Sequence, residues 1–389
     1  MSNEENIILN DWHDKDLYLS ENILRGIYAY GFEIPSKIQR MSIPHIIKGK
    51  NVIAEANSGT GKTGSYLIGV ISKIYEALNH LQCIILSPTR ELAQQIHDVG
   101  KKLAKYTSIR FHLLVGGTDI QRDILDLKKN TPHIVVGSIG RISDIIYREV
   151  LDTSLTKILV IDEADEMLSN GFHNSVQNIF NYLHRDVQII LFSATISEYV
   201  LTVTKKLMNN PVHIKLTNDD LLTNDFKQYK VICRSDSEKY NVLKNLFNVM
   251  YFSQCIIYCN SIIRVSDLYE AMKDDDFPVT YIHSNMCKTE RNSRFSSFVF
   301  GTYRVLISTN LTSRGIDIQQ VSTVINFDLP KTKETYIHRI GRSGRWGKKG
   351  VSISFCTMRE IQSIKEIENF YDTHISELSA DFDEKFKFE

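Results

Sequence analysis

The segment from Ala56 to Thr63 has the residue types of a phosphate-binding loop. It follows the apolar run Asn51–Ala54 and precedes a helix-like segment from Gly64 to Leu78. Gly59 and Gly61 allow backbone N–H groups to converge on an anion, and the positive end of the following helix adds to the attraction. The segment therefore predicts a site for a nucleoside triphosphate. Its expected contacts are Ala56, Asn57, Ser58, Gly59, Thr60, Gly61, Lys62 and Thr63.

Two side chains at the end of this loop carry the expected chemistry. Lys62 supplies a positive charge for the β- and γ-phosphates, and Thr63 supplies a hydroxyl for Mg²⁺. Ala56 stands where the usual pattern has its first Gly, so the match is a variant with a small residue. The alternative reading is a Gly-rich turn before a core helix, which the order of strand, loop, Lys-Thr and helix disfavours.

A pair of carboxylates completes this predicted site. Asp162 and Glu163 follow the apolar run Ile158–Ile161. Asp162 is expected to hold Mg²⁺ through water, and Glu163 to orient or deprotonate the attacking water. Asp-Glu-Ala-Asp is also typical of a solvated helix start. The phosphate loop upstream favours the catalytic interpretation.

Alternation of short β-branched runs with amphipathic segments predicts an α/β fold. The runs are apolar on both faces, which indicates parallel sheets covered by helices on each side. In such sheets ligands bind beyond the carboxyl ends of the strands. The pattern breaks in the polar stretch Thr217–Asp225 and then resumes without a second phosphate loop. We therefore expect two similar domains, of which only the first holds nucleotide from its own loop.

Composition narrows the class of protein. With 389 residues, 42% apolar and 24% charged, the chain suits two ordinary globular domains. The formal net charge of +0 provides no overall positive field, but a local groove can still bind nucleic acid. Cys255 and Cys259 have no second pair to complete a zinc site, so reduced thiols are expected. No stretch is apolar and long enough to span a bilayer, which predicts an intracellular protein.

The second half carries its own cluster of candidate residues. Arg342 and Arg345 are three residues apart after a Gly and could hold two oxygens of a γ-phosphate. The alternative is a basic helix end that offsets carbonyl dipoles. A domain without its own phosphate loop needs a way to sense nucleotide on the other, which favours the first interpretation.

Taken together, the motifs resemble those of the DEAD-box RNA helicases over the chain from about Asp16 onward. The matching segments are the Gln39 segment, Ala56–Thr63, Pro88–Ala93, Gly116-Gly117, Asp162–Asp165, Ser193–Thr195, Arg314–Asp317 and His338–Arg345. Within the family, the chain is most similar to the group of translation initiation factor 4A. The resemblance implies two tandem RecA-like domains at 16–213 and 227–389, a linker at 214–226 and a flexible tail at 1–15.

The resemblance also implies roles for individual residues. Nucleotide contacts outside the loop are expected from Phe32, Gln39 and Asp317, and γ-phosphate contacts from Arg342 and Arg345 in a closed state. Expected RNA contacts are Pro88, Thr89, Arg90, Gly116, Gly117, Ser138 and Arg141 in the first domain and Asn260, Arg291 and Thr309 in the second. Coupling between the domains is expected from Asp165, Ser193, Thr195 and His338.

Several residues depart from the family pattern. Ile139 replaces a usual Pro, so we expect a looser turn before Arg141. The other departures are Ser284-Asn285 for Gly-Asp, Lys288 for Gln, and Asn310 for Asp. They predict retained ATP binding with weaker stimulation by RNA. The aromatic residue expected on adenine is displaced, and Trp12 is the candidate for that role.

The resemblance implies an ATP- and Mg²⁺-dependent RNA helicase that unwinds short duplexes, acting in translation initiation. Contacts to phosphate and 2′-hydroxyl groups imply little sequence preference. The alternative is a slowly hydrolysing RNA clamp or assembly scaffold in RNA processing or ribosome assembly. A DNA translocase is a third, weaker option. We also expect the protein to be a monomer in the cytoplasm and to bind a helical-repeat scaffold protein.

Overall fold

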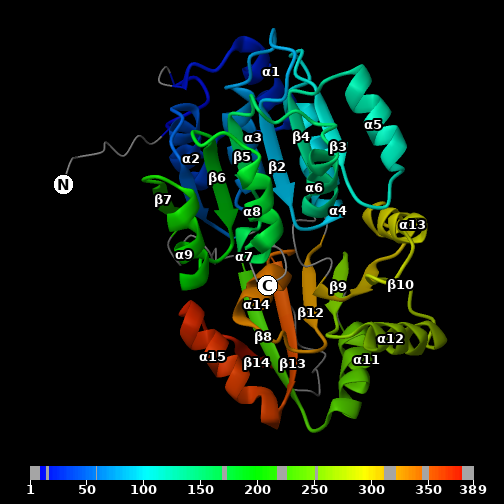
Figure 1. Ribbon diagram of the computed structural model, residues 1–389. Helices are drawn as coiled ribbons and strands as arrows, with labels where there is room; N and C mark the ends of the chain where they lie inside the picture. The colour runs from blue at the N-terminus through cyan, green and yellow to red at the C-terminus, as the bar shows by residue number, and fades with distance from the viewer. Residues whose placement is uncertain are drawn as a thin grey trace. The chain divides into compact units, whose positions relative to one another are not determined.

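The computed structural model describes residues 9–14, 17–57, 59–168, 173–216, 226–249, 253–310, 321–343 and 350–378. The chain divides into two compact units, Met1–Leu216 and Thr217–Glu389. Each unit has its own core of buried Ile, Leu and Val side chains. The ribbon diagram in Figure 1 shows the helices and strands of both units.

The first unit is built on a seven-stranded parallel sheet with strand order β3-β4-β2-β5-β6-β1-β7. Its strands are β1 (Val52–Glu55), β2 (Cys83–Ser87), β3 (Phe111–Leu114), β4 (Ile134–Ser138), β5 (Ile158–Ile161), β6 (Gln188–Ser193) and β7 (Val212–Lys215). Its helices are α1 (Glu21–Tyr30), α2 (Lys37–Ile47), α3 (Lys62–Ile71), α4 (Arg90–Leu103), α5 (Ile120–Lys129), α6 (Ile139–Tyr147), α7 (Ala164–Met167), α8 (His173–Asn181) and α9 (Glu198–Leu207).

The second unit has a seven-stranded parallel sheet with strand order β10-β11-β9-β12-β13-β8-β14. Numbered within each unit, the two orders are identical. Its strands are β8 (Phe226–Cys233), β9 (Cys255–Tyr258), β10 (Val279–Ile282), β11 (Val305–Ser308), β12 (Thr323–Asn326), β13 (Gly350–Thr357) and β14 (Ser376–Leu378). Its helices are α11 (Lys239–Val249), α12 (Ile262–Asp274), α13 (Lys288–Val299), α14 (Lys333–Ile340) and α15 (Ile361–Tyr371), with short 3₁₀ turns at Asp236–Glu238 and Met358–Glu360.

The two covered parallel sheets confirm the predicted α/β class. Every residue of β2, β5 and β6 is buried, as expected for strands with helices on both faces (Figure 1). Because parallel strands end at one edge, the loops after β1, β2, β4, β5 and β6 meet along the same side of the sheet. Most of the site residues predicted from the sequence of the first domain lie in these loops.

Three boundaries differ from the sequence-based expectation. Leu9 and Trp12 are buried, and the Leu9 N–H donates to the Arg40 carbonyl at 3.1 Å, so 9–14 are not a loose tail. Lys215 pairs with Glu55 as the end of β7, so the predicted linker begins too early. Helix α3 ends at Ile71 and does not reach Leu78. Residues 9–14 and the edge strand β7 were not predicted as ordered structure because few of their residues face the core.

Candidate active site and nucleic-acid interface

The phosphate-binding loop lies between β1 and α3. The Ala56 N–H donates to the Ser193 carbonyl at 3.0 Å, which ties the loop to the end of β6. Gly59 and Gly61 have φ values of 87° and 103°, in the left-handed region that glycine enters without a steric penalty. Helix α3 begins at Lys62, so the loop ends on a helix N-terminus. Ser58 lies outside the described residues.

Lys62 and Glu163 form a buried ion pair. Lys62 Nζ lies 3.4 Å from Glu163 Oε2, and the two side chains are 6% and 3% exposed. Glu163 follows β5 with φ 49° and ψ 56°, a left-handed conformation that costs a non-glycine residue about 1–3 kcal/mol. This turn points the carboxylate toward the loop rather than along the strand.

Asp162 is held through both of its carboxylate oxygens. Oδ1 accepts from the Glu163 N–H at 2.9 Å, and Oδ2 accepts from the Tyr66 hydroxyl at 2.9 Å. Burial, followed by the nearby Glu163 charge, raises the pKa of Asp162 to about 6. Burial and the Asp162 charge also raise the pKa of Tyr66 well above its usual value, so this hydroxyl keeps its proton. The sequence-based interpretation did not include Tyr66, although a tyrosine within an apolar helix signals a buried polar partner.

Gln39 and Phe32 pack directly against the phosphate loop. Gln39 Oε1 accepts from the Ser36 N–H at 2.8 Å, and Nε2 donates to the Gly61 carbonyl at 3.3 Å. A Cβ at Gly64 would lie 2.7 Å from Gln39 Nε2 and 2.9 Å from the Phe32 ring. Gln39 thus supports the loop, and its amide retains one N–H and one lone pair for a base edge.

The proposed role of Trp12 on adenine is wrong. Its side chain is 1% exposed and stacks on Phe32, with ring centroids 6.5 Å apart. A ring buried in the core of the first unit has no face available to a nucleotide.

Three of the four residues expected to couple the domains lie together in the first unit. The Ser193 hydroxyl accepts from the Asp165 N–H at 3.1 Å and donates to the Thr195 carbonyl at 2.7 Å. The Thr195 hydroxyl donates to Asp165 Oδ2 at 3.1 Å. The fourth residue, His338, belongs to α14 of the second unit. The first three residues therefore link the loop after β5 to the loop after β6 through hydrogen bonds.

The expected RNA contacts of the first unit follow β2, β3 and β4, which are neighbours in its sheet. Pro88 and Thr89 precede α4, and the Thr89 hydroxyl caps this helix by accepting from the Leu92 N–H at 3.2 Å. The Gly116 N–H donates to the Ser138 hydroxyl at 3.4 Å. A Cβ on Gly116 would lie 3.0 Å from Arg90 Nη2. The structure therefore brings these predicted residues to one edge.

Arg141 does not project from this edge as the sequence suggested. Its guanidinium forms an ion pair with Asp123 and donates to the Thr118 hydroxyl at 2.9 Å and to the Thr118 carbonyl at 2.8 Å. Its side chain is only 9% exposed. Arg141 therefore holds the loop that contains Gly116 and Gly117. The looser turn expected from Ile139 is not observed either, because Ile139 begins α6 with its side chain buried.

In the second unit, Arg339 connects the ends of three neighbouring strands. Its guanidinium donates to Asn310 Oδ1 at 2.7 and 2.8 Å, to Asn260 Oδ1 at 2.7 Å and to the Asp328 carbonyl at 2.7 Å. All of these acceptors are uncharged. Burial lowers the pKa of Arg339 to about 10. Asn260 is thus engaged by Arg339 and also donates to the Leu329 carbonyl at 2.7 Å.

The remaining candidates of the second unit are only partly described. Thr309 follows β11, and Arg291 lies in the first turn of α13. Arg342 lies beyond the end of α14 at Ile340. Its Nε donates to the His338 carbonyl at 3.1 Å. Asp317 and Arg345 lie outside the described residues.

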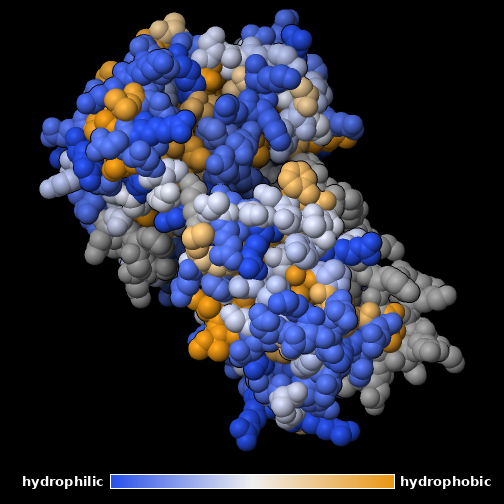
Figure 2. Space-filling view, turned by 90° about the vertical axis from the view of Figure 1, so that its right-hand side faces the viewer, coloured by the Kyte–Doolittle hydropathy of each residue, from blue (hydrophilic) through white to orange (hydrophobic). Residues whose placement is uncertain are grey.

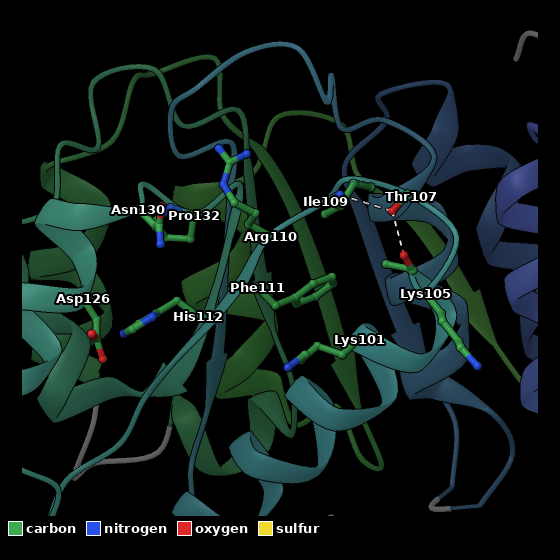
Figure 3. Close-up of a pocket in the computed structure, with 11 residues that line it drawn as sticks. Lys101, Lys105, Thr107, Ile109, Arg110, Phe111, His112, Asp126, Asn130 and Pro132 are labelled. Atoms are coloured by element: carbon green, nitrogen blue, oxygen red, sulfur yellow. Dashed lines mark hydrogen bonds between the residues drawn. The ribbon is translucent and has the colours of Figure 1, made fainter.

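A separate hollow of about 590 Å³ lies beside the beginning of β3. Lys101 and Lys105 line it, together with Arg110 (Figure 3). The Arg110 guanidinium is already committed to the Thr131 carbonyl at 2.9 Å and to Asn79 Oδ1 at 2.6 Å. Since ligands of such sheets bind at the opposite, carboxyl ends of the strands, this hollow is not part of the site.

On the face that Figure 2 shows, hydrophobic residues are scattered among hydrophilic ones. None of the helices in the described part of the chain combines the length and hydropathy needed to cross a membrane. A glycine loop, a lysine and a carboxylate pair at the edge of a parallel sheet define a phosphate-loop nucleotide hydrolase. A second unit of the same strand order places the chain among the two-domain members of this class.

Comparisons with known proteins agree with this class. Residues 36–203 match the model of the DEAD/DEAH box helicase, and 238–347 match that of the helicase conserved C-terminal domain. The chain is 44% identical over 363 residues to eukaryotic initiation factor 4A of Caenorhabditis elegans, covering 93% of this chain and 90% of the relative. It is 43% identical over 363 residues to the ATP-dependent RNA helicase FAL1 of Coccidioides immitis, covering 93% and 91%.

Solved structures give the same result. Saccharomyces cerevisiae Dbp5 bound to RNA and ADP BeF3 matches with a TM-score of 0.88 and 33% identity, covering 94% of this chain and 95% of that one. Mss116p bound to single-stranded RNA and AMP-PNP matches with a TM-score of 0.86 and 25% identity, covering 97% and 80%. The chain belongs to the DEAD-box family of ATP-dependent RNA helicases. The family resemblance and the two-domain architecture inferred from the sequence are confirmed.

Proposed function

We propose that the first unit hydrolyses ATP with Glu163 positioning the attacking water. The observation that carries this proposal is the contact between Lys62 and Glu163 at the mouth of the glycine loop, with Asp162 beside them. Lys62 is the proposed contact to the phosphates, and Glu163 is the proposed partner of the water. Thr63 and Asp162 offer a hydroxyl and a carboxylate, the hard oxygen donors that suit Mg²⁺. When bound, the ion would neutralise charge on the phosphates.

RNA is proposed to lie along the strand-end loops of both units. Arg90, Gly116 and Ser138 in the first unit, and Thr309 in the second, are the proposed contacts to phosphate and ribose. Because such groups occur in every sequence, little sequence preference is expected. Arg342 and Arg345 would reach the γ-phosphate only when ATP and RNA draw the two units together, which would bend one strand and open a short duplex.

A role in translation initiation, like that of initiation factor 4A, is the finer proposal. It is supported by relatives of that name at 43–44% identity over nearly the whole chain. The proposed partner is a helical-repeat scaffold protein of the initiation machinery, and the proposed location is the cytoplasm. The alternative is a slowly hydrolysing RNA clamp or assembly scaffold in RNA processing or ribosome assembly. Relatives with other names, such as the ATP-dependent RNA helicase FAL1, match at a similar 43% identity.

Three measurements separate these functions. Steady-state ATP hydrolysis is measured with RNA, with DNA of the same sequence and without nucleic acid, alongside unwinding of a short duplex. Strong stimulation by RNA alone, with unwinding, supports the helicase and rejects both the clamp and the DNA translocase. Restored translation of a capped messenger in an extract depleted of initiation factor 4A would support the initiation role. No restoration by an active preparation rejects that role.

Replacing Gly116 by Ala tests the RNA-binding edge of the first unit. The new Cβ would approach Arg90 Nη2 to 3.0 Å, so the guanidinium has to shift. Since a hydrogen bond to a charged group contributes about 1.5–3 kcal/mol, weakening such a bond by this small shift of Arg90 predicts about threefold weaker binding of labelled single-stranded RNA. Fluorescence anisotropy measures this change.

Gly140→Ala is the matched control for this variant. A Cβ at Gly140 meets nothing within 4 Å, and this residue lies within α6, where Ala is favoured over Gly. We expect parent RNA affinity in this control and parent nucleotide affinity in both variants. Equal RNA affinity of Gly116→Ala and Gly140→Ala would contradict the proposed contact between Arg90 and RNA.

A further inference from the structure

Tyr66 is a fully buried tyrosine inside the helix that follows the phosphate loop. It lies one turn after Lys62 in α3, and its exposed fraction is 0%. Its ring packs edge-on against Phe192 of β6, with centroids 5.5 Å apart. A phenylalanine would fill the same space, so packing alone does not account for the hydroxyl. Burying a hydroxyl is unfavourable unless it finds partners.

The partner of this hydroxyl is a residue that we assign to the metal site. Tyr66 donates its one hydrogen to Asp162 Oδ2 at 2.9 Å. Tyr66 therefore connects the start of α3 to the end of β5.

The direction of this bond suits a cation ligand. Because the Tyr66 hydroxyl supplies the hydrogen, the Asp162 carboxylate acts as an acceptor, as a cation ligand does. At Asp162, one oxygen is fixed by Tyr66 and the other by the Glu163 N–H at 2.9 Å. The carboxylate plane is thereby set, and each oxygen retains lone pairs for a further ligand. Groups that orient ligands in this way strongly affect metal affinity.

We propose that Tyr66 is a positioning residue of the magnesium site, because its hydroxyl holds the Asp162 carboxylate in the orientation that receives the ion. This inference rests on the magnesium site proposed above. Tyr66 touches neither nucleotide nor water in this role and acts through Asp162.

The test measures how nucleotide binding depends on Mg²⁺ in the full-length protein. A fluorescent N-methylanthraniloyl-ADP is titrated at a series of Mg²⁺ concentrations into the parent and the Tyr66→Phe variant. Outer-shell substitutions typically weaken metal binding by about 10- to 100-fold. We expect the Mg²⁺ concentration for half-maximal tightening to rise about tenfold in Tyr66→Phe, while nucleotide affinity without Mg²⁺ stays at the parent value.

Tyr336→Phe provides a matched control. Tyr336 is also fully buried, and its hydroxyl donates to Gln228 Oε1 at 2.7 Å in the second unit. Both variants lose one buried hydrogen bond, so a merely structural role of Tyr66 predicts similar losses of thermal stability and an unchanged Mg²⁺ dependence. That result would overturn the inference. If nucleotide binding by the parent does not depend on Mg²⁺, the proposed metal site itself fails, which is a distinct outcome.

Discussion

Glu163→Gln is expected to slow ATP turnover by a factor of about 10²–10⁴ while leaving ATP affinity nearly unchanged. General-base positioning of water contributes rate enhancements of that size. Glutamine has the shape of glutamate, so the left-handed turn at φ 49° and the packing around it are preserved. The substitution removes the charge that pairs with Lys62 at 3.4 Å, and this leaves the ammonium free for phosphate. Steady-state hydrolysis with saturating RNA and equilibrium nucleotide binding measure the two quantities.

Glu198→Gln is the control for this prediction. Glu198 is exposed in the first turn of α9, in the same unit, and should leave turnover at the parent rate. Lys62→Ala gives the complementary result, because loss of the ammonium should weaken nucleotide binding itself. Parent turnover in Glu163→Gln would exclude Glu163 from the chemical step.

Arg339→Met is expected to destabilise the second unit by about 3 kcal/mol and to weaken RNA binding. Methionine fills much of the space, but Asn260 Oδ1 and Asn310 Oδ1 lose their hydrogen bonds to the guanidinium, and a hydrogen bond to a charged group contributes about 1.5–3 kcal/mol. The loops after β9 and β11 then lose their common anchor. Chemical denaturation of the full chain, with hydrogen exchange of peptides from β11 and β12, locates the loss in this unit.

Asn310→Asp gives the opposite test of the same cluster. Within the described parts of the chain, the Arg339 guanidinium donates only to uncharged acceptors, and a carboxylate at 310 would supply a charge-assisted hydrogen bond. We expect this variant to gain about 1–2 kcal/mol of stability and to show stronger stimulation of hydrolysis by RNA. Unchanged stability and unchanged stimulation would show that Asn310 causes no deficit.

Much of the architecture was predictable because fully buried strands have a strong sequence signal. Runs such as Ile158–Ile161 are apolar throughout, and β5 has these bounds. Strands β7 and β14 were missed because each has only one buried residue. At the sheet edge, motif spacing indicated Lys62 and Glu163 correctly as neighbours in space, since both follow strand ends.

The residues that the sequence did not reveal act through tertiary contacts. Arg141 was expected at RNA, yet Asp123 from α5 engages it, and no local pattern indicates that pairing. Arg339 belongs to the His338–Arg345 motif, but its structural role was not predicted because its partners come from three separate strand ends. Such roles depend on which loops the topology brings together, and a single sequence does not encode this locally.

The identical strand order of the two sheets has an evolutionary reading, since it is the signature expected of an internal duplication. In the copy, the segment that corresponds to the glycine loop is the 3₁₀ turn Asp236–Glu238, and the helix after it begins at Lys239, just as α3 begins at Lys62. Lys239 Nζ is neutralised by Asp236 at 3.2 Å and by Glu360 at 3.6 Å. Lys239 is thus a structural cation, and the acidic residues beside it disfavour phosphate at the place that corresponds to the glycine loop.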